Sequence, residues 1–324
     1  MPEIRYLAAI NRALGDALQD DPTVVVFGED VSEAGGSFGA SRGLRERFGA
    51  DRVFDTPISE AAIAGAAVGA ALSGLRPVVE IMFMDFTTLV MDAMVNQAAK
   101  ARFMFGGQAS VPMVLRTPHG GGLGAGPQHS QCLEAWFAHI PGLKVVCPSD
   151  PVSAYGLLRA AIADPDPVVV VENKALYAMK GEVPDQLEPM PIGHARILRE
   201  GRDVTLVSYG AAVHTCRKAA DRLAAEGVEP EVLDLLSLQP WDEAAVLASL
   251  SRTHRLVVVH EAVEAFGIGA EIAARMADIG FDELDAPIAR VGAPFMPVPF
   301  SKALESAYIP SADAVAGAVR RILA

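Results

Sequence analysis

Glu60 is the residue of this chain best placed to hold and release a proton. It precedes residues 61–72, which contain seven alanines, two glycines and no charged residue. This composition predicts a helix that begins at Glu60, is capped by the side chain of Ser59 and is approached closely on every side. A helix N-terminus favours the carboxylate, whereas exclusion of water favours the neutral acid. Glu60 is therefore a candidate acid–base residue, with a surface carboxylate that only complements the helix dipole as the alternative.

A second carboxylate and an apolar cluster follow two expected strands. Residues 23–27 predict a buried strand, and Glu29 comes just beyond it, at the edge where open α/β sheets bind their ligands. Residues 76–81 predict another strand, which leads into a cluster of methionine and phenylalanine from Met82 to Phe86. A solvated turn at Glu29 and a core cluster at Met82 and Phe86 are the alternatives to a binding site.

A glycine-rich loop over residues 117–131 carries the best histidine candidate. Residues 120–125 match the form Gly-x-Gly-x-x-Ala of a dinucleotide fingerprint. Pro127 interrupts the turn, and about twenty residues further on there are valines rather than an acid for the ribose. A nucleotide-dependent oxidoreductase is thus an alternative that the context disfavours. The loop instead presents His129 between two polar residues, which makes it a candidate catalytic residue, with a structural histidine as the alternative.

An α/β scaffold is needed to position these residues. Strand and helix patterns alternate in both halves, which predicts two doubly wound, mostly parallel sheets with helices on both faces. Turn-rich residues 173–202 separate the halves, so we expect one domain over 1–185 and a second over 186–324. The expected strands are 23–27, 76–81, 111–115, 144–146, 167–172, 204–208, 232–235, 256–260 and 288–291, and the expected helices are 4–18, 60–72, one ending near 105, 151–163, 213–225, 243–251 and one from about 268.

Composition and charge exclude several classes of function. The chain has 324 residues, a net charge of −13 and 51% apolar residues. The negative charge argues against nucleic acid or an anionic membrane as partner, and no apolar run reaches the roughly 20 residues of a membrane span. Three widely spaced cysteines and an opening without a secretory pattern predict a cytoplasmic protein. The apolar excess predicts extensive contacts with other subunits.

Five short strings in fixed order carry a family resemblance. They resemble the β subunit of the E1 component of thiamine-diphosphate-dependent 2-oxoacid dehydrogenase complexes, including the acetoin dehydrogenase relatives. The resemblance covers nearly the whole chain. The strings are Phe-Gly-Glu-Asp-Val at 27–31, Asp-Thr-Pro-Ile-Ser-Glu at 55–60, Gln-His-Ser-Gln at 128–131, Pro-Gly-Leu-Lys-Val-Val at 141–146 and Glu-Asn-Lys-Ala-Leu-Tyr at 172–177.

The resemblance implies roles for the candidate residues. It implies a transketolase-like domain that binds the cofactor's aminopyrimidine and a transketolase-like C-terminal domain. By residue matching, Glu60 would hydrogen-bond the pyrimidine nitrogen N1′, with Glu29 as a carboxylate near it. Met82 and Phe86 would pack against the pyrimidine. His129 would face the substrate and the incoming lipoyl group.

The resemblance also implies a site shared with a second polypeptide. Thiamine enzymes hold the diphosphate through a divalent ion on a Gly-Asp-Gly segment, which this sequence lacks. An α subunit would then supply the Mg²⁺ ligands, in an α2β2 heterotetramer that acts on a lipoyl-bearing E2 core. Family members also bind potassium through backbone oxygens, which here would be those of Met113, Ala161, Ile162, Asp164 and Asp166.

The expected activity is decarboxylation of a 2-oxoacid or cleavage of acetoin, with reductive acylation of lipoyl-E2. The residues from Met82 to Phe86 lean toward acetoin-type members, whereas Gln131-Cys132 leans toward pyruvate-type ones. A branched-chain 2-oxoacid is also open, so the substrate is undecided. A non-catalytic chain that docks E2, with turnover in the partner subunit, is the alternative function.

Overall fold

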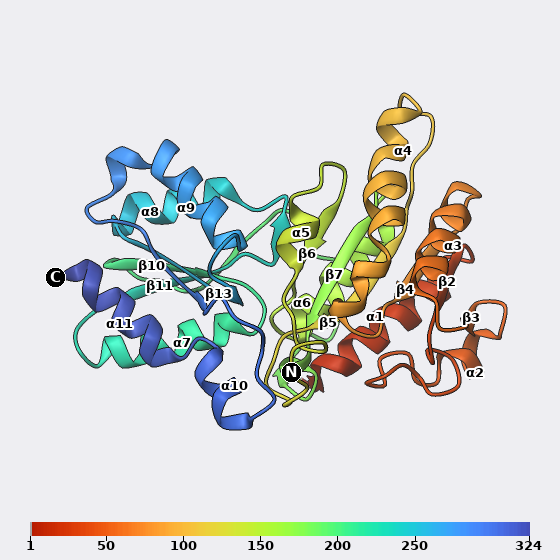
Figure 1. Cartoon of the computed structure of the whole chain (residues 1–324), viewed down its shortest axis with the longest axis horizontal. Coiled ribbons are helices and arrows are strands. Elements are labelled where there is room, and N and C mark those ends of the chain that lie inside the picture. The colour runs from red at the N-terminus through yellow and green to blue at the C-terminus, as the bar shows by residue number, and fades with distance from the viewer. Residues whose placement is uncertain (1) are drawn as a thin grey trace. The chain divides into compact units, whose positions relative to one another are not determined.

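The structure is a computed structural model that describes residues 2–324, and it divides into two compact units (Figure 1). The first unit runs to His119 and resumes at Trp136–Ile192, and the second comprises Gly120–Ala135 and Gly193–Ala324. The expected division between residues 185 and 186 differs from these units in two respects. Residues 120–135 group with the second unit, and the first unit extends to Ile192.

The first unit is built on a parallel sheet with the strand order β6-β7-β5-β4-β2-β3. Its strands are apolar on both faces because helices cover a parallel sheet. Gly28 at the end of β2 pairs with Asp55 on one side and with Glu80 on the other, so three strands end together. The strands are β2 (Val24–Gly28), β3 (Val53–Asp55), β4 (Arg76–Glu80), β5 (Val114–His119), β6 (Lys144–Val146) and β7 (Val168–Asn173).

The helices of this part depart from expectation at two places. The first helix begins at Tyr6 rather than Ile4, because residues 3–5 form strand β1, which pairs antiparallel with β8. The helix expected to end near 105 is broken into 3₁₀, π and α segments, a distortion often found at functional sites. The remaining elements are α1 (Tyr6–Asp20), α2 (Leu44–Phe48), α3 (Glu60–Leu72), η1 (Met84–Leu89), η2 (Ala93–Ala98), α4 (Ala99–Met104), α5 (Glu134–Ala138), α6 (Pro151–Ala163), η3 (Lys174–Leu176), β1 (Glu3–Arg5) and β8 (Lys180–Glu182).

Helix α3 begins at Glu60 as predicted, but the expectation of close packing on every side is wrong. One face is buried through Ile63, Ala64 and Ala67, and the opposite face is exposed. A Cβ added at Gly65 or Gly69 would meet no atom of the described chain within 4 Å. The side chain of Ser59 makes no capping hydrogen bond to the residues that the structure describes. The small residues therefore leave one side of α3 bare.

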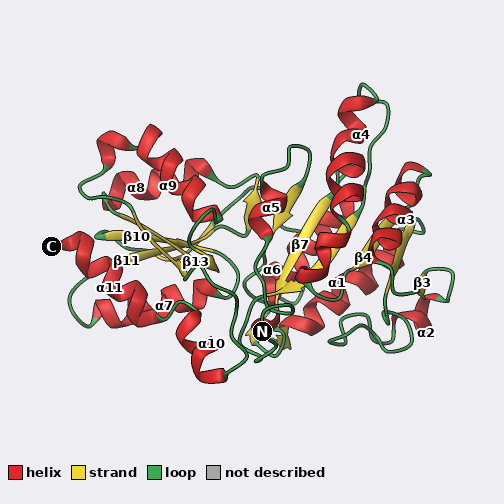
Figure 2. Ribbon diagram, viewed as in Figure 1, coloured by secondary structure: helices red, strands yellow, loops and turns green. Residues whose placement is uncertain are grey.

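The second unit is a sheet with the order β14-β13-β10-β11-β9, parallel except for the edge strand β9. Helices α8 and α9 lie on one side of it and α7 and α11 on the other (Figure 2). Valines and leucines of the strands pack against alanines and valines of α7 and α11 to form the core. The elements are β9 (Arg196–Arg199), β10 (Val204–Ser208), α7 (Ala212–Ala224), β11 (Pro230–Asp234), β12 (Ser237–Gln239), α8 (Glu243–Thr253), β13 (Leu256–Val263), α9 (Ile268–Ile279), η4 (Phe281–Glu283), β14 (Ala289–Ala293), α10 (Lys302–Tyr308) and α11 (Ala312–Leu323).

Both units confirm the predicted class of doubly wound, mostly parallel α/β sheets. Several further elements were not expected from the sequence. Strands β8 and β9 lie within residues 173–202, which were expected to be turns only. Helices α10 and α11 follow the strand that was expected to close the fold. Across residues 2–324, no helix combines the length and apolar character that crossing a membrane requires.

Candidate active site

Glu29 and Glu60 are two buried carboxylates, and the charge of Glu60 acts on Glu29. Glu29 follows β2 directly and Glu60 is the first residue of α3, and they are 7% and 8% exposed. Burial raises the pKa of Glu29, and the negative charges of Glu60 and Asp30 raise it further. The Oε1 atom of Glu29 is buried and has no hydrogen-bond partner within residues 2–324. Glu29 is therefore able to hold a proton more tightly than an ordinary glutamate, and its Oε1 is available to another donor.

Asp55 fixes the backbone that follows Glu29. Its carboxylate accepts hydrogen bonds from the backbone N–H of Ser32 at 2.7 Å and from the Ser32 hydroxyl at 2.6 Å. Burial alone would raise the pKa of Asp55, but the hydrogen bonds from Ser32 and Glu33, together with the charge of Arg45, lower it. Gly28 permits the tight approach of β2 to β4, because a Cβ there would lie 2.6 Å from the carbonyl oxygen of Glu80. Asp55 and Gly28 thus set the position of Glu29.

Phe86 and Met82 are half-buried, in or next to a segment that packs against α3. Phe86 belongs to η1, which packs against α3, and Met82 precedes η1 by two residues. The ring of Phe86 packs edge-on against Phe83 at 5.6 Å between centroids, and Phe83 packs against Phe38 at 5.8 Å. These contacts hold the Phe86 ring in place and leave part of its surface accessible, as a ring-binding wall requires.

A buried ionic cluster that was not expected from the sequence lies in the same unit. Arg116 is 2% exposed, and its guanidinium bonds Glu80 at 2.8 Å and Glu172 at 2.8 and 2.9 Å. The hydroxyl of Tyr177 donates to Glu172 at 2.9 Å, and its ring packs against Phe38. Burial raises the pKa of Glu80 even though Arg116 opposes this. Charged residues inside the apolar strands β4, β5 and β7 were the signal that could have revealed the cluster.

His129 lies in the second unit, whereas Glu29, Glu60, Met82 and Phe86 lie in the first. The His129 ring is partly exposed, and its backbone N–H donates to the carbonyl of Gly126 at 3.4 Å. The amides that a nucleotide phosphate would need are already engaged: those of Gly121, Gly122 and Gly124 donate to glutamates of the same unit. This geometry is inconsistent with the dinucleotide interpretation of the loop.

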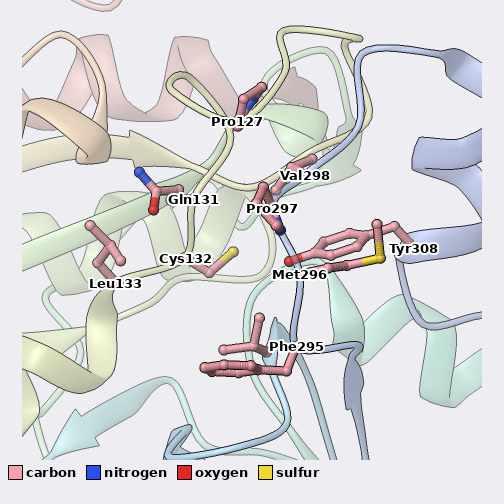
Figure 3. Close-up of a pocket in the computed structure, with 10 residues that line it drawn as sticks. Pro127, Gln131, Cys132, Leu133, Phe295, Met296, Pro297, Val298 and Tyr308 are labelled. Carbon is pink, nitrogen blue, oxygen red and sulfur yellow. The ribbon is translucent and has the colours of Figure 1, made fainter.

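An apolar pocket of about 320 Å³ lies within the second unit, and residues of the glycine loop form part of its wall (Figure 3). Pro127 and Gln131, two residues on either side of His129, belong to its wall. Burial raises the pKa of Tyr308 to about 12, with smaller contributions from Cys132 and Glu261. The lining residues are Pro127, Gln131, Cys132, Leu133, Val263, Phe295, Met296, Pro297, Val298 and Tyr308.

Of the residues matched to a potassium site, Ala161, Ile162, Asp164 and Asp166 lie at or just beyond the end of α6, and Met113 precedes β5. The carbonyls of Ile162 and Asp164 accept hydrogen bonds from Nη1 of Arg76 at 2.9 and 3.2 Å. Nζ of Lys144 lies 2.6 Å from the carboxylate of Asp164. The carbonyls of Met113 and Ala161 accept backbone hydrogen bonds from residues 168 and 164. A carbonyl oxygen has two lone pairs, so these oxygens can bind a cation in addition to the hydrogen bonds that they already accept. That cation would share the region with the positive charges of Arg76 and Lys144.

Comparison with known proteins identifies the domain family of each unit. Residues 2–180 match the pyrimidine-binding domain of transketolase, and residues 193–315 match its C-terminal domain. The β subunit of acetoin:2,6-dichlorophenolindophenol oxidoreductase from Bacillus subtilis is 49% identical, over 97% of this chain and 96% of the relative. The pyruvate dehydrogenase E1 subunit beta-2 of Oryza sativa is 45% identical, over 98% of this chain and 86% of the relative.

A solved structure supports the fold. The chain of a structure titled "Split gene transketolase, inactive beta4 tetramer" superposes with a TM-score of 0.82 at 24% identity, covering 99% of this chain and 98% of that one. At this identity the likeness establishes the architecture only. Together with the two domain matches and the close relatives, it shows that the chain belongs to the transketolase-like β-subunit family that contains the pyruvate dehydrogenase E1 and acetoin oxidoreductase β subunits.

Proposed function

We propose that this chain is the β subunit of a thiamine-diphosphate-dependent E1 enzyme. The enzyme would decarboxylate a pyruvate-like 2-oxoacid or cleave acetoin, and would acylate the lipoyl group of an E2 core. The observation that carries the proposal is the pair of buried carboxylates, Glu29 and Glu60, within a domain of the pyrimidine-binding type. An acid at the start of α3 beside a second buried acid is suited to hold a proton at a ring nitrogen.

The residues of the first unit fit the cofactor's pyrimidine. Glu60 would hold a proton at the ring nitrogen N1′, and the unpaired Oε1 of Glu29 offers an acceptor next to it. Met82 and Phe86 would cover the ring and exclude water from it. When bound, thiamine diphosphate supplies a nucleophilic carbon that attacks the substrate carbonyl. The chain's contribution is to orient the ring and to control the proton at N1′.

His129 would serve the substrate side of the reaction. It has two ring nitrogens for proton transfer or hydrogen bonding, and the apolar pocket lined by its loop neighbours Pro127 and Gln131 suits the hydrocarbon part of an acyl group or of its acceptor. The diphosphate and Mg²⁺ would be held by an α subunit, because this sequence has no Gly-Asp-Gly segment. The relatives' names describe them as β subunits, which supports a partner chain.

The bare face of α3 supports an α2β2 assembly. Exposed apolar side chains at the end of α4, Phe103 and Met104 at 89% and 71% exposure, are further surface that a partner subunit would cover. Potassium remains part of the proposal through the carbonyls near the end of α6. A binding-only role, with E2 docking and no catalysis in this chain, is the second candidate. The exposed apolar residues suit it equally well.

Titration of thiamine diphosphate and Mg²⁺ by calorimetry tests the divided site. We expect no tight binding to the chain alone and tight binding after reconstitution with its α chain. A screen of 2-oxoacids and acetoin with the reconstituted enzyme then identifies the substrate. Tight binding by the chain alone would contradict the two-subunit site, and absence of binding by the reconstituted pair would contradict the cofactor.

A further inference from the structure

Two buried glutamates of the second unit hold the glycine loop by its backbone. The N–H of Gly121 donates to Oε1 of Glu261 at 2.6 Å. The N–H groups of Gly122 and Gly124 donate to Oε1 and Oε2 of Glu305 at 2.8 and 2.9 Å. Glu305 is 2% exposed and Glu261 is 8% exposed. Three amides of one loop are thus bound by two carboxylates that are distant in sequence.

Glu305 is an unusual residue for its helix. Helix α10 has seven residues, and apart from Glu305 and Tyr308 all of them are exposed. Simple packing of such a helix would place an apolar side chain inward, since burial of a carboxylate is unfavourable without hydrogen bonds. Each oxygen of Glu305 accepts one amide, so the requirement is met by the loop itself. The buried Glu305 side chain is therefore stabilised by hydrogen bonds from the loop rather than by packing in an apolar core.

The same C-terminal segment contacts the loop on both sides of Glu305. Gly126 has a φ of +76°, and a Cβ there would lie 2.1 Å from the Phe300 ring. A Cβ at Gly121 would lie 3.1 Å from Cδ1 of Ile309. The loop is thereby held by Phe300, Glu305 and Ile309, which precede, occupy and follow α10.

His129 is joined to the anchored part of the loop by a short stretch of backbone. It lies three residues beyond Gly126 and bonds that residue's carbonyl through its N–H. Tyr308, at the end of α10, lines the same pocket as Pro127 and Gln131, which flank His129 (Figure 3). The position of α10 therefore determines both the backbone of His129 and one wall of the pocket.

We propose that Glu305, assisted by Glu261, is a positioning residue that fixes the glycine loop and so holds His129 in the orientation that the reaction requires. The Glu305 carboxylate acts through the backbone amides of Gly122 and Gly124. The catalytic part of this inference rests on the role proposed for His129. The structural part, that Glu305 immobilises the loop, is independent of that role.

Hydrogen–deuterium exchange of the reconstituted complex tests the structural part. Glutamine at 305 can accept only one of the two amides, because its NH₂ group faces the second donor. Loss of a charged hydrogen bond should speed exchange of the peptide covering residues 120–126 by about tenfold in E305Q. Exposed Glu271 on α9 provides the matched control E271Q, which should leave this peptide unchanged. Unchanged exchange in E305Q would overturn the proposal.

A double-mutant cycle tests the catalytic part. E305Q should lower kcat by about tenfold with KM for the 2-oxoacid or acetoin changed less than about twofold, since orientation rather than binding is lost. Combined with H129A, E305Q should cause little further loss, because the residue it positions is gone. Full additivity of the two losses would overturn the positioning role. A normal kcat in H129A alone would instead contradict the proposed function of His129, with the exchange result still deciding whether Glu305 holds the loop.

Discussion

Glu29 titrates above an ordinary glutamate because it is buried and because the charge of Glu60 lies beside it. The two residues come from different elements, the end of β2 and the start of α3. Their proximity depends on the parallel register of β2 with β3 and on the turn from Asp55 to Glu60. This relationship leads to the first two predictions.

Replacement of Glu29 by glutamine should change how stability depends on pH. The native state binds the Glu29 proton more tightly than the unfolded chain does, so its stabilising contribution is present below the ordinary pKa of 4.5 and is lost as the pH rises through the raised folded value. The free energy of unfolding of E29Q relative to wild type should therefore increase between about pH 4 and about pH 7. Urea denaturation at both pH values measures it, and E271Q is the control. A constant difference would show that Glu29 is not desolvated.

Replacement of Glu60 by glutamine should separate catalysis from assembly. The shape of the side chain is kept, but the acid that would hold the proton at N1′ is lost. We expect kcat of the reconstituted enzyme to fall by about 10²–10⁴-fold with assembly intact. Steady-state kinetics and sedimentation together measure this. Full activity of E60Q would favour the E2-docking role over the proton-transfer role.

Replacement of Arg116 by methionine should destabilise the first unit strongly. The change leaves Glu80 and Glu172 buried without their cation, and loss of one partner from a buried ion pair typically lowers the free energy of unfolding by about 3–5 kcal/mol. The matched change R5M, at an exposed arginine of β1, should cost less than about 0.5 kcal/mol. Chemical denaturation of both variants provides the comparison. Equal stability of R116M and R5M would mean that water enters the cluster.

Potassium should raise thermal stability if the carbonyls near the end of α6 bind it. At equal ionic strength, KCl should raise Tm over NaCl by about 2–4 °C for each kcal/mol of binding free energy. Differential scanning calorimetry in the two salts measures the shift. Identical melting curves in both salts would remove potassium from the proposal and leave Arg76 and Lys144 as the cations of this region.

Alanine at Gly65 and Gly69 should stabilise the isolated chain and weaken its assembly. Nothing in the described chain would meet the added Cβ atoms, and each change should add about 0.5–1 kcal/mol to helix stability. Gly317 in α11 is the control, since it has the same open surroundings and lies in the second unit. Denaturation of the chain alone and sedimentation with the α chain separate the two effects. Unimpaired assembly of the double variant would exclude α3 from the subunit contact.

Features with a local cause were predictable from the sequence. Runs of valine such as those at 24–26 and 168–171 reveal buried parallel strands, and the uncharged stretch after Glu60 reveals the extent of α3. The exposed face of α3 was not predictable, because burial depends on which neighbours cover a helix. The contacts of Arg116 and Glu305 were missed for the same reason, since they join residues up to 183 positions apart.

The placement of residues 120–135 has a consequence for dividing the protein. The chain passes from one unit to the other at residues 119/120, 135/136 and 192/193, so no single cut separates them. A fragment ending at residue 185 would retain the glycine loop but lose Glu261 and Glu305, the carboxylates that bind its amides. Such a fragment would expose unpaired N–H groups where a folded loop had been. The two units are therefore expected to fold only when they are expressed together as one length of chain.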